Sequence, residues 1–159
     1  MLVCLGVTCE EFPCAVLLPP GRPTWGFGAS HQPPAVAALT ASLTAMGYFP
    51  TTHAVFGAMA DKDLAPMLAR IGPLVDRWYF TDLPTPRASS AQALLASWQA
   101  QNKRAQATAT TYADPLQALH AAQAAADPAD RIVVFGSFFT VGGILKEGVP
   151  RLQAKHMST

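Results

Sequence analysis

From residue 34 onward the sequence alternates two kinds of segment, and this alternation restricts the chain to few folds. Short runs rich in apolar, aromatic and β-branched residues, at 53–56, 78–80 and 131–135, are each followed by a longer run with apolar residues at helical spacing. Parallel strands must be joined by long crossover connections, usually helices, whereas antiparallel strands need only short turns. The pattern therefore predicts an α/β fold in which helices cover a parallel sheet.

Turn and capping residues mark where these helices begin and end. Gly47 ends the first helical run and Gly72 ends the second. Ser90, or the serine before it, is placed to cap a third helix, and Asp114 followed by proline is a favourable start for a fourth. Between these two helices, residues 106–112 alternate threonine with alanine, which predicts only a weak strand because alanine is a poor strand former.

The first 33 residues lack this regularity. Residues 2–7 and 14–18 have the composition of short strands, and the stretch rich in proline and glycine over 19–34 is predicted as a loop. We therefore expect three parts: an irregular N-terminal segment over 1–33, one α/β domain over 34–150 and a flexible tail over 151–159. A chain of 159 residues is ordinarily one domain with a substantial core.

Composition excludes several classes of protein. Eleven Lys and Arg nearly balance ten Asp and Glu, whereas nucleic-acid binding normally needs an excess of basic residues. Half of the residues are hydrophobic and 13% are charged, which argues against intrinsic disorder. The longest mainly apolar stretch, over 132–145, is shorter than the roughly 18 residues of a membrane span. Since the N-terminus also lacks a basic signal-peptide region, we expect a cytoplasmic protein with no nucleic-acid or membrane partner.

All three cysteines, Cys4, Cys9 and Cys14, lie within the first 14 residues. An odd number at this spacing predicts no disulfide framework. The spacing also lacks the short chelating pair and the nearby fourth ligand of a zinc site. We therefore expect small buried or incidental thiols and no metal site.

Three segments are predicted at the edge of the sheet where the carboxyl ends of parallel strands meet helix N-termini: residues 26–32, 57–63 and 136–140. In the second, Lys62 can hold an anionic substrate group, while Asp61 and Asp63 beside it are also the residue type that caps a helix. In the third, Ser137 either contacts a ligand or caps the next helix. In the first, His31 can act on a phosphate or carry a proton.

Other residues near these segments are given structural roles. Phe138 and Phe139, directly after Ser137, are expected in the core, and His53, His120 and His156 are expected to be structural or exposed.

Several catalytic motifs are absent from the sequence. There is no G-x-x-x-x-G-K-[ST], so the chain does not by itself hold a nucleoside triphosphate in the P-loop manner. The nearest match to a dinucleotide fingerprint is Gly26-x-Gly28, which has His31 where a third glycine is needed. There is also no G-x-S-x-G, and hence no nucleophile elbow.

Two segments together resemble a known family. The runs HAVFGAMADKD at 53–63 and IVVFGSFFTV at 132–141 resemble, in their order and spacing, the C-terminal domain of bacterial folylpolyglutamate synthase/dihydrofolate synthase, a branch of the Mur ligase superfamily. The similarity covers about residues 35–149. It implies a Rossmann-like α/β domain, a mostly parallel sheet with helices on both faces, that helps to bind the incoming amino acid.

The resemblance also implies an ATP-dependent amide ligase. In such enzymes ATP phosphorylates a carboxylate, and the amine of glutamate attacks the acyl phosphate to form an amide. ATP and Mg are held mainly by a preceding P-loop domain, so neither is expected to bind tightly to this chain. The expected partners are glutamate, folate or dihydropteroate, and the missing ATPase domain.

By the same resemblance, Lys62 matches a cation near the glutamate carboxylate, and Ser137 matches a hydroxyl contact in that subsite. Asp61 and Asp63, beside the lysine, are further substrate-binding candidates. The family's Asp-x-Ala-His-Asn-Pro stretch corresponds to residues 28–33, which keep the histidine and the proline but have glycine and glutamine in place of Asp and Asn. His31 is accordingly the catalytic and nucleotide-side candidate.

The leading hypothesis is a C-terminal, glutamate-binding domain of a folate-glutamate ligase that is inactive alone. The alternative is a non-catalytic binding or interaction module that keeps the fold. A third interpretation is that the N-terminal part is an eroded or misread coding segment, because the pattern changes abruptly near residue 35.

Overall fold

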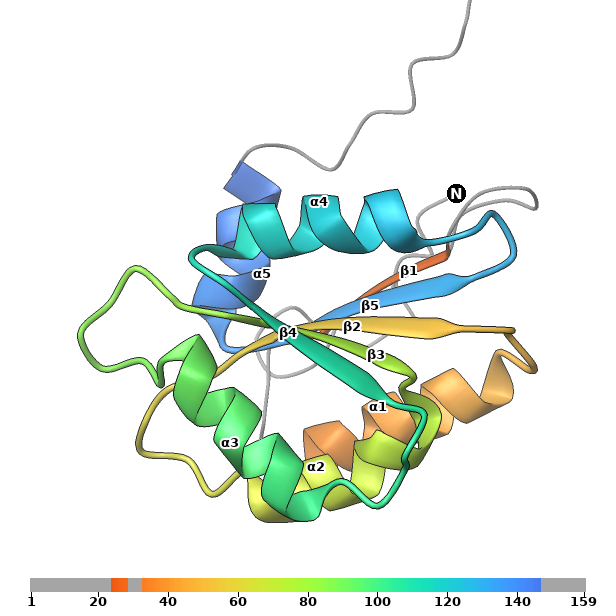
Figure 1. Cartoon of the computed structure of the whole chain (residues 1–159), viewed down its shortest axis with the longest axis horizontal. Helices are drawn as coiled ribbons and strands as arrows, with labels where there is room; N and C mark the ends of the chain where they lie inside the picture. The colour runs from red at the N-terminus through yellow and green to blue at the C-terminus, as the bar shows by residue number, and fades with distance from the viewer. Residues whose placement is uncertain (1–23, 29–32, 147–159) are drawn as a thin grey trace, which may run out of the picture.

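The computed structural model describes residues 24–28 and 33–146, along which strands and helices alternate (Figure 1). The strands are β1 (Thr24–Gly28), β2 (Thr52–Gly57), β3 (Arg77–Thr81), β4 (Thr108–Tyr112) and β5 (Arg131–Gly136). The helices are α1 (Pro33–Ala45), α2 (Ala65–Ile71), α3 (Ala91–Gln101), α4 (Pro115–Ala125) and α5 (Phe138–Lys146), with a 3-10 turn, η1 (Gly72–Leu74), after α2. The predicted alternation is confirmed, including the weak strand of threonine and alanine.

These strands form one parallel sheet in the order β1-β5-β2-β3-β4. Figure 1 shows α1, α2 and α3 on one face of the sheet and α4 and α5 on the other. The predicted α/β class, a parallel sheet with helices on both faces, is therefore confirmed. Within residues 24–28 and 33–146, no helix combines the length and the hydropathy needed to cross a membrane.

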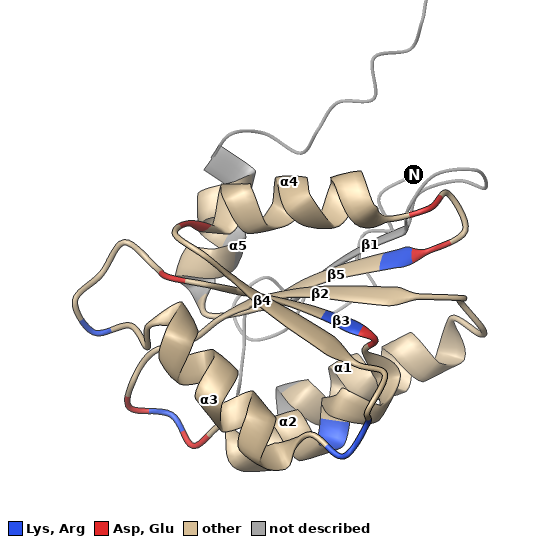
Figure 2. Ribbon diagram, viewed as in Figure 1, with Lys and Arg blue, Asp and Glu red and all other residues tan. Residues whose placement is uncertain are grey.

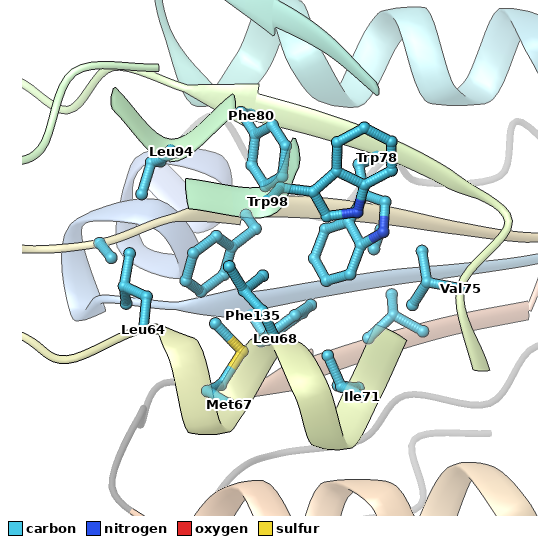
Figure 3. Close-up of a cluster of buried hydrophobic side chains, with 14 of the residues drawn as sticks. Leu64, Met67, Leu68, Ile71, Val75, Trp78, Phe80, Leu94, Trp98 and Phe135 are labelled. Atoms are coloured by element: carbon cyan, nitrogen blue, oxygen red, sulfur yellow. The ribbon is translucent and has the colours of Figure 1, made fainter. Parts of the chain in front are cut away.

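Side chains of the central strands divide between two hydrophobic cores, because successive residues of a strand point to opposite faces. On β5, Val133 and Phe135 pack with the helices of the first face, whereas Ile132 and Val134 pack with those of the second. Figure 3 shows the first core, in which side chains of α2 and α3 surround the aromatic rings of the sheet, Trp78 among them. Burial on both faces explains why these strands read as continuous apolar runs.

The prediction of a loop over residues 19–34 is wrong for residues 24–28, which form β1. This strand pairs in parallel with β5, from Thr24 opposite Arg131 to Gly28 opposite Phe135. Two glycines among its five residues weaken the strand pattern, since glycine has no side chain to pack. Pairing is favourable because it satisfies backbone N–H and C=O groups along the outer side of β5. The strands expected at 2–7 and 14–18 lie outside the described residues.

Helix starts agree with the predicted capping residues. The Ser90 side chain accepts a hydrogen bond from the backbone N–H of Ala93 in α3, and the Asp114 side chain accepts one from Gln117 in α4. These bonds satisfy donors that the first turn of a helix leaves unpaired. Gly47, just after α1, has a φ of 86°, a left-handed conformation that glycine adopts at low cost.

The expectation that Phe139 belongs to the core is wrong, because its residue is 41% exposed. Among the α5 residues whose burial the structure describes, Thr140 and Ile144 are fully buried, four positions apart on the side that faces the sheet. Phe139 comes one residue before that stripe and therefore points about 100° away from it. The side chain of Phe138 lies outside what the structure describes.

A hydrogen-bonded group of polar side chains is buried at the amino end of the sheet. His53, at the start of β2, is fully buried, as its expected structural role allows. Its Nδ1 lies 2.9 Å from the Tyr79 hydroxyl and its Nε2 lies 3.0 Å from Asp130 Oδ2. Both ring nitrogens are thus paired, which offsets the cost of removing the imidazole from water. His120 is exposed, and His156 lies outside the described residues.

A buried arginine joins α1 to the same end of the sheet. The Nη1 of Arg131 donates to the Leu43 carbonyl at 2.7 Å, and its Nε and Nη2 donate to the Thr52 hydroxyl at 3.2 and 3.0 Å. Its guanidinium also lies 4.7 Å from the centroid of the Phe49 ring, a cation–π contact. Burial lowers the pKa of Arg131 from its usual value. The amino end of the sheet is therefore occupied by the protein's own polar groups.

Because Tyr79 is buried, we expect the free energy of unfolding to fall at alkaline pH. Burial raises the pKa of its phenol, so the folded state holds the phenol proton more tightly than the unfolded state does. This contribution to the free energy of unfolding is fully present below the ordinary tyrosine pKa of about 10 and is lost as pH rises through the raised value. In urea unfolding between about pH 8 and pH 11, Tyr79→Phe should lose stability less steeply with pH than the wild type.

The control for this experiment is Tyr48→Phe, since Tyr48 is 89% exposed. This variant should keep the wild-type slope of unfolding free energy against pH. Equal slopes for the wild type and Tyr79→Phe would contradict the prediction.

Candidate functional site

The carboxyl ends of β2 and β5 lie side by side, at the position where open α/β sheets have their ligand crevice. These strands are neighbours, and their last residues, Gly57 and Gly136, lie opposite each other. From β2 the chain continues to α2 on one face, and from β5 it continues to α5 on the other. In open α/β sheets, ligands bind where neighbouring strands send their connections to opposite faces. The fold therefore makes this edge the candidate site.

Glycine is required where the end of β5 meets the end of β2. Gly136 has a φ of 117°, and a Cβ added there would collide with the carbonyl oxygen of Gly57. That close approach lets the Ser137 backbone N–H donate to the Gly57 carbonyl at 2.9 Å. The ends of β2 and β5, and the loops that leave them, are thus held in fixed relation.

The loop from β2 to α2 carries three of the predicted site residues, Asp61, Lys62 and Asp63. Figure 2 shows a basic patch between two acidic ones on this loop. The Lys62 Nζ lies 3.5 Å from Asp61 Oδ2, and the two side chains are 38% and 56% exposed. Ion pairs of this kind contribute little to stability, so the ammonium group remains available to an anionic ligand. Asp63 precedes Leu64, the N-cap residue of α2, and its Oδ1 accepts a hydrogen bond from the Ala65 N–H at 3.3 Å.

Lys62 lines a pocket between its own loop and α3. The pocket has a volume of about 340 Å³, and its polar lining includes Asp63, Ser89, Ser97 and Gln101. Such a surface combines the positive charge of Lys62 and the negative charge of Asp63 with hydroxyl and amide groups. It can hold a small molecule that carries a carboxylate.

The loop from β3 to α3 forms backbone hydrogen bonds with the loop that carries Lys62. The Ala60 N–H donates to the Arg87 carbonyl at 2.8 Å, and the Ser89 N–H donates to the Ala58 carbonyl at 2.9 Å. Met59 and Ala88 form an isolated antiparallel bridge between these two bonds. The backbone before Lys62 is therefore fixed although the lysine side chain is exposed.

Of the two roles that the sequence left open for Ser137, the structure shows the cap. Ser137 is only 4% exposed, and its hydroxyl oxygen accepts a hydrogen bond from the Phe139 N–H at 3.2 Å, as a helix cap does. A hydroxyl that accepts in this way keeps its own O–H as a donor. Ser137 and Lys62 follow adjacent strands at one edge of the sheet, but Ser137 does not line the pocket that contains Lys62.

Other candidates from the sequence lie outside the described residues: His31, proposed for the nucleotide side, and the cysteines at 4, 9 and 14. Among residues 24–28 and 33–146, no three His, Cys, Asp or Glu side chains come together as metal ligands.

Sequence reasoning predicts no role for two polar residues at this edge, Asp82 and Thr140, although Thr140 lies within the predicted segment 136–140. Asp82 follows β3, and its Oδ1 accepts a hydrogen bond from the Ala91 N–H at 2.6 Å. Its position directly after a strand is a signal that could have identified it. Thr140, fully buried in α5, donates its hydroxyl to the Gly57 carbonyl at 3.0 Å. No local pattern reveals this contact, because the partners are 83 residues apart.

Comparison with known proteins identifies the fold and the family. The family model described as Mur ligase, glutamate ligase domain, matches residues 26–138. The chain belongs to this family. It is 32% identical over 120 residues to dihydrofolate synthase/folylpolyglutamate synthase of Escherichia coli (strain K12), a match that covers 76% of this chain and 26% of that protein.

Solved structures agree with this assignment of the Mur ligase domain. E. coli FolC in complex with DHPP and ADP matches with a TM-score of 0.74 and 30% identity, over 84% of this chain and 30% of that one. A bifunctional folylpolyglutamate synthase/dihydrofolate synthase with Mn, AMPPNP and L-glutamate bound matches with a TM-score of 0.69 and 29% identity, over 82% and 30%. The chain thus spans 26% to 30% of the length of these relatives, and the predicted resemblance is confirmed.

The contact between the two glycines predicts a strong effect of Gly136→Ala. The added methyl group would collide with the Gly57 carbonyl, and alanine is strained at a φ of 117°. We expect a loss of at least about 1–3 kcal/mol in the free energy of unfolding, measured by urea denaturation.

Gly72→Ala is the matched control, because Gly72 has a helical φ of −50° and nothing within 4 Å of an added Cβ. It should be neutral or stabilise the domain by up to about 1 kcal/mol. Similar destabilisation by both substitutions would contradict the close approach of β2 and β5.

Proposed function

We propose that this domain holds glutamate for an ATP-dependent amide ligase acting on folate or dihydropteroate. The observation that carries the proposal is the exposed ammonium group of Lys62, on a backbone fixed at the crevice between β2 and β5. Membership of the glutamate ligase domain family supports the choice of ligand. Lys62 would pair with a carboxylate of glutamate, and the Ser137 O–H would donate to the same molecule.

In the proposed reaction, ATP phosphorylates a carboxylate of the folate substrate, giving an acyl phosphate and ADP. The amine of glutamate then attacks the acyl carbon, the amide bond forms, phosphate leaves and the amine loses a proton. The contribution of this chain is to orient the amine by holding the carboxylates of glutamate. Fixing two reactants in this way removes much of the entropic cost of their encounter.

Nucleotide and Mg are assigned mainly to the P-loop ATPase domain of the family, and neither is expected to bind tightly to this chain. The sequence has no P-loop motif, and the described residues offer no cluster of metal ligands. His31 stays the candidate for contact with the nucleotide phosphates. We therefore propose that the chain alone binds glutamate without forming the amide bond.

Titration of the ¹⁵N-labelled chain with L-glutamate tests the binding role directly. We expect saturable changes in amide chemical shifts over 58–63 and 137–140. Lys62→Ala should weaken binding about tenfold, since hydrogen bonds to charged groups are worth roughly 1.5–3 kcal/mol and 1.4 kcal/mol is tenfold in affinity. Lys103→Ala, which removes an exposed lysine after α3, should leave the affinity unchanged.

L-Glutamine is the second control, because it lacks the side-chain carboxylate and should bind more weakly. A chain that stays folded and shows no saturable response to L-glutamate would refute the proposal. That result would favour the alternative, a non-catalytic interaction module.

A ligase assay tests the catalytic context. The purified chain, given ATP, Mg, glutamate and dihydropteroate, should yield no amide product. Co-expression with the remaining part of the E. coli relative should restore product formation, and Lys62→Ala should then raise the KM for glutamate. Product from the isolated chain would disprove the proposed dependence on residues outside it.

A further inference from the structure

We propose that Thr140 is a positioning residue for this site. Its buried hydroxyl connects α5 to the Gly57 carbonyl and so sets the place of the Lys62 loop relative to Ser137. This inference rests on the proposed binding of glutamate at the crevice. The inference gives a role to a buried side chain. Thr140 is not among the residues that line the pocket of Lys62.

The Gly57 carbonyl oxygen accepts two hydrogen bonds from the start of α5. One comes from the backbone N–H of Ser137 at 2.9 Å and the other from the Thr140 hydroxyl at 3.0 Å. A carbonyl oxygen has two lone pairs, so both acceptor positions are used. The Thr140 N–H in turn donates to the Ser137 carbonyl at 2.9 Å. The last residue of β2 is thereby fixed to the first turn of α5 through two atoms of that turn.

The space around Gly57 leaves little freedom for this contact to shift. A Cβ built on Gly57 would lie 2.8 Å from the Thr140 hydroxyl oxygen, 2.8 Å from a Leu83 methyl carbon and 3.1 Å from one of Thr81. Leu83 and Thr81 are buried, at 8% and 0% exposure. Thr140 therefore occupies a close-packed position at the end of β2, where its hydroxyl meets the backbone directly.

Lys62 lies five residues beyond this contact. Between them, the loop is held on its outer side by the bonds of Ala58 and Ala60 to the β3–α3 loop. Those bonds fix the loop relative to α3, whereas its place relative to α5 is set by the β2–β5 pairing and, at the end of that pairing, by the two bonds to the Gly57 carbonyl. Ser137 belongs to the α5 side and Lys62 to the loop side, so the distance between the two ligand-binding candidates depends on this junction. Loss of the Thr140 hydroxyl removes one of its two hydrogen bonds.

Thr140→Val tests the inference, because valine keeps the shape of the side chain and removes only its hydroxyl. In the L-glutamate titration, we expect binding to weaken about three- to tenfold, or about 0.7–1.4 kcal/mol, which lies within the usual net contribution of a hydrogen bond. Hydrogen exchange at the Ser137 amide should accelerate. Thr140→Ser keeps the hydroxyl and should bind within about twofold of the wild type.

Two comparisons separate positioning from general stability. Thr40→Val removes a hydroxyl that donates to the Val36 carbonyl at 2.8 Å within α1, far along the chain from both loops, and should leave glutamate affinity unchanged. Each variant is titrated under conditions in which urea denaturation shows it to be fully folded. The titration then reports affinity and not the amount of folded protein. Should valine prevent folding, Thr140→Ala against Thr140→Ser supplies a second pair that differs by the hydroxyl alone.

The outcomes distinguish this inference from the function on which it rests. Weaker binding by the variants without a hydroxyl, with recovery in Thr140→Ser, supports positioning by Thr140. Wild-type affinity in Thr140→Val, in an experiment where Lys62→Ala lowers affinity, overturns the positioning role and leaves the proposed function standing. A wild-type chain that does not bind L-glutamate overturns both.

Discussion

The close parallel pairing of β2 with β5 is the constraint on which the rest of the domain depends. These strands are the centre of the sheet, both are buried on both faces, and they separate the two hydrophobic cores. Their register places Gly57 against Gly136, and the absence of side chains there lets the backbone of α5 reach the end of β2. The place of the candidate site at this edge therefore follows from the strand order and from packing in the middle of the sheet.

The two ends of the sheet have opposite characters. At the amino end, His53 and Arg131 are buried and their hydrogen-bonding atoms are paired with other parts of the protein. At the carboxyl end, Lys62 is exposed and its ion pair with Asp61 is long, while the backbone beneath it is fixed by hydrogen bonds. The carboxyl end also has buried polar groups, such as Thr140, but it adds an exposed lysine held on a fixed backbone. Exposed loop residues on a rigid scaffold are a common arrangement for binding sites.

Much of this could be predicted from the sequence because the signals are local. Apolar runs buried on both faces identify parallel strands, and Ser90 and Asp114 cap helices through bonds to residues three positions away. Two features could not be predicted in this way. β1 forms through its pairing with β5, more than 100 residues later, despite its two glycines. Thr140 likewise gains its place only when Gly57, 83 residues earlier, is brought beside it. The burial of Phe139 was also predicted wrongly. In a short helix, neighbouring residues can differ completely in burial, as exposed Phe139 and buried Thr140 do.

The pair of glycines where β2 meets β5 also separates what this chain can vary from what it cannot. A side chain added at Gly136 would meet the Gly57 carbonyl, and one added at Gly57 would meet Leu83 and Thr140. Substitution at either position therefore disturbs the junction between β2 and α5. The exposed residues of the loop after β2, Asp61 and Lys62 among them, are free of that restriction, so the surface at this edge can change without rearranging the sheet.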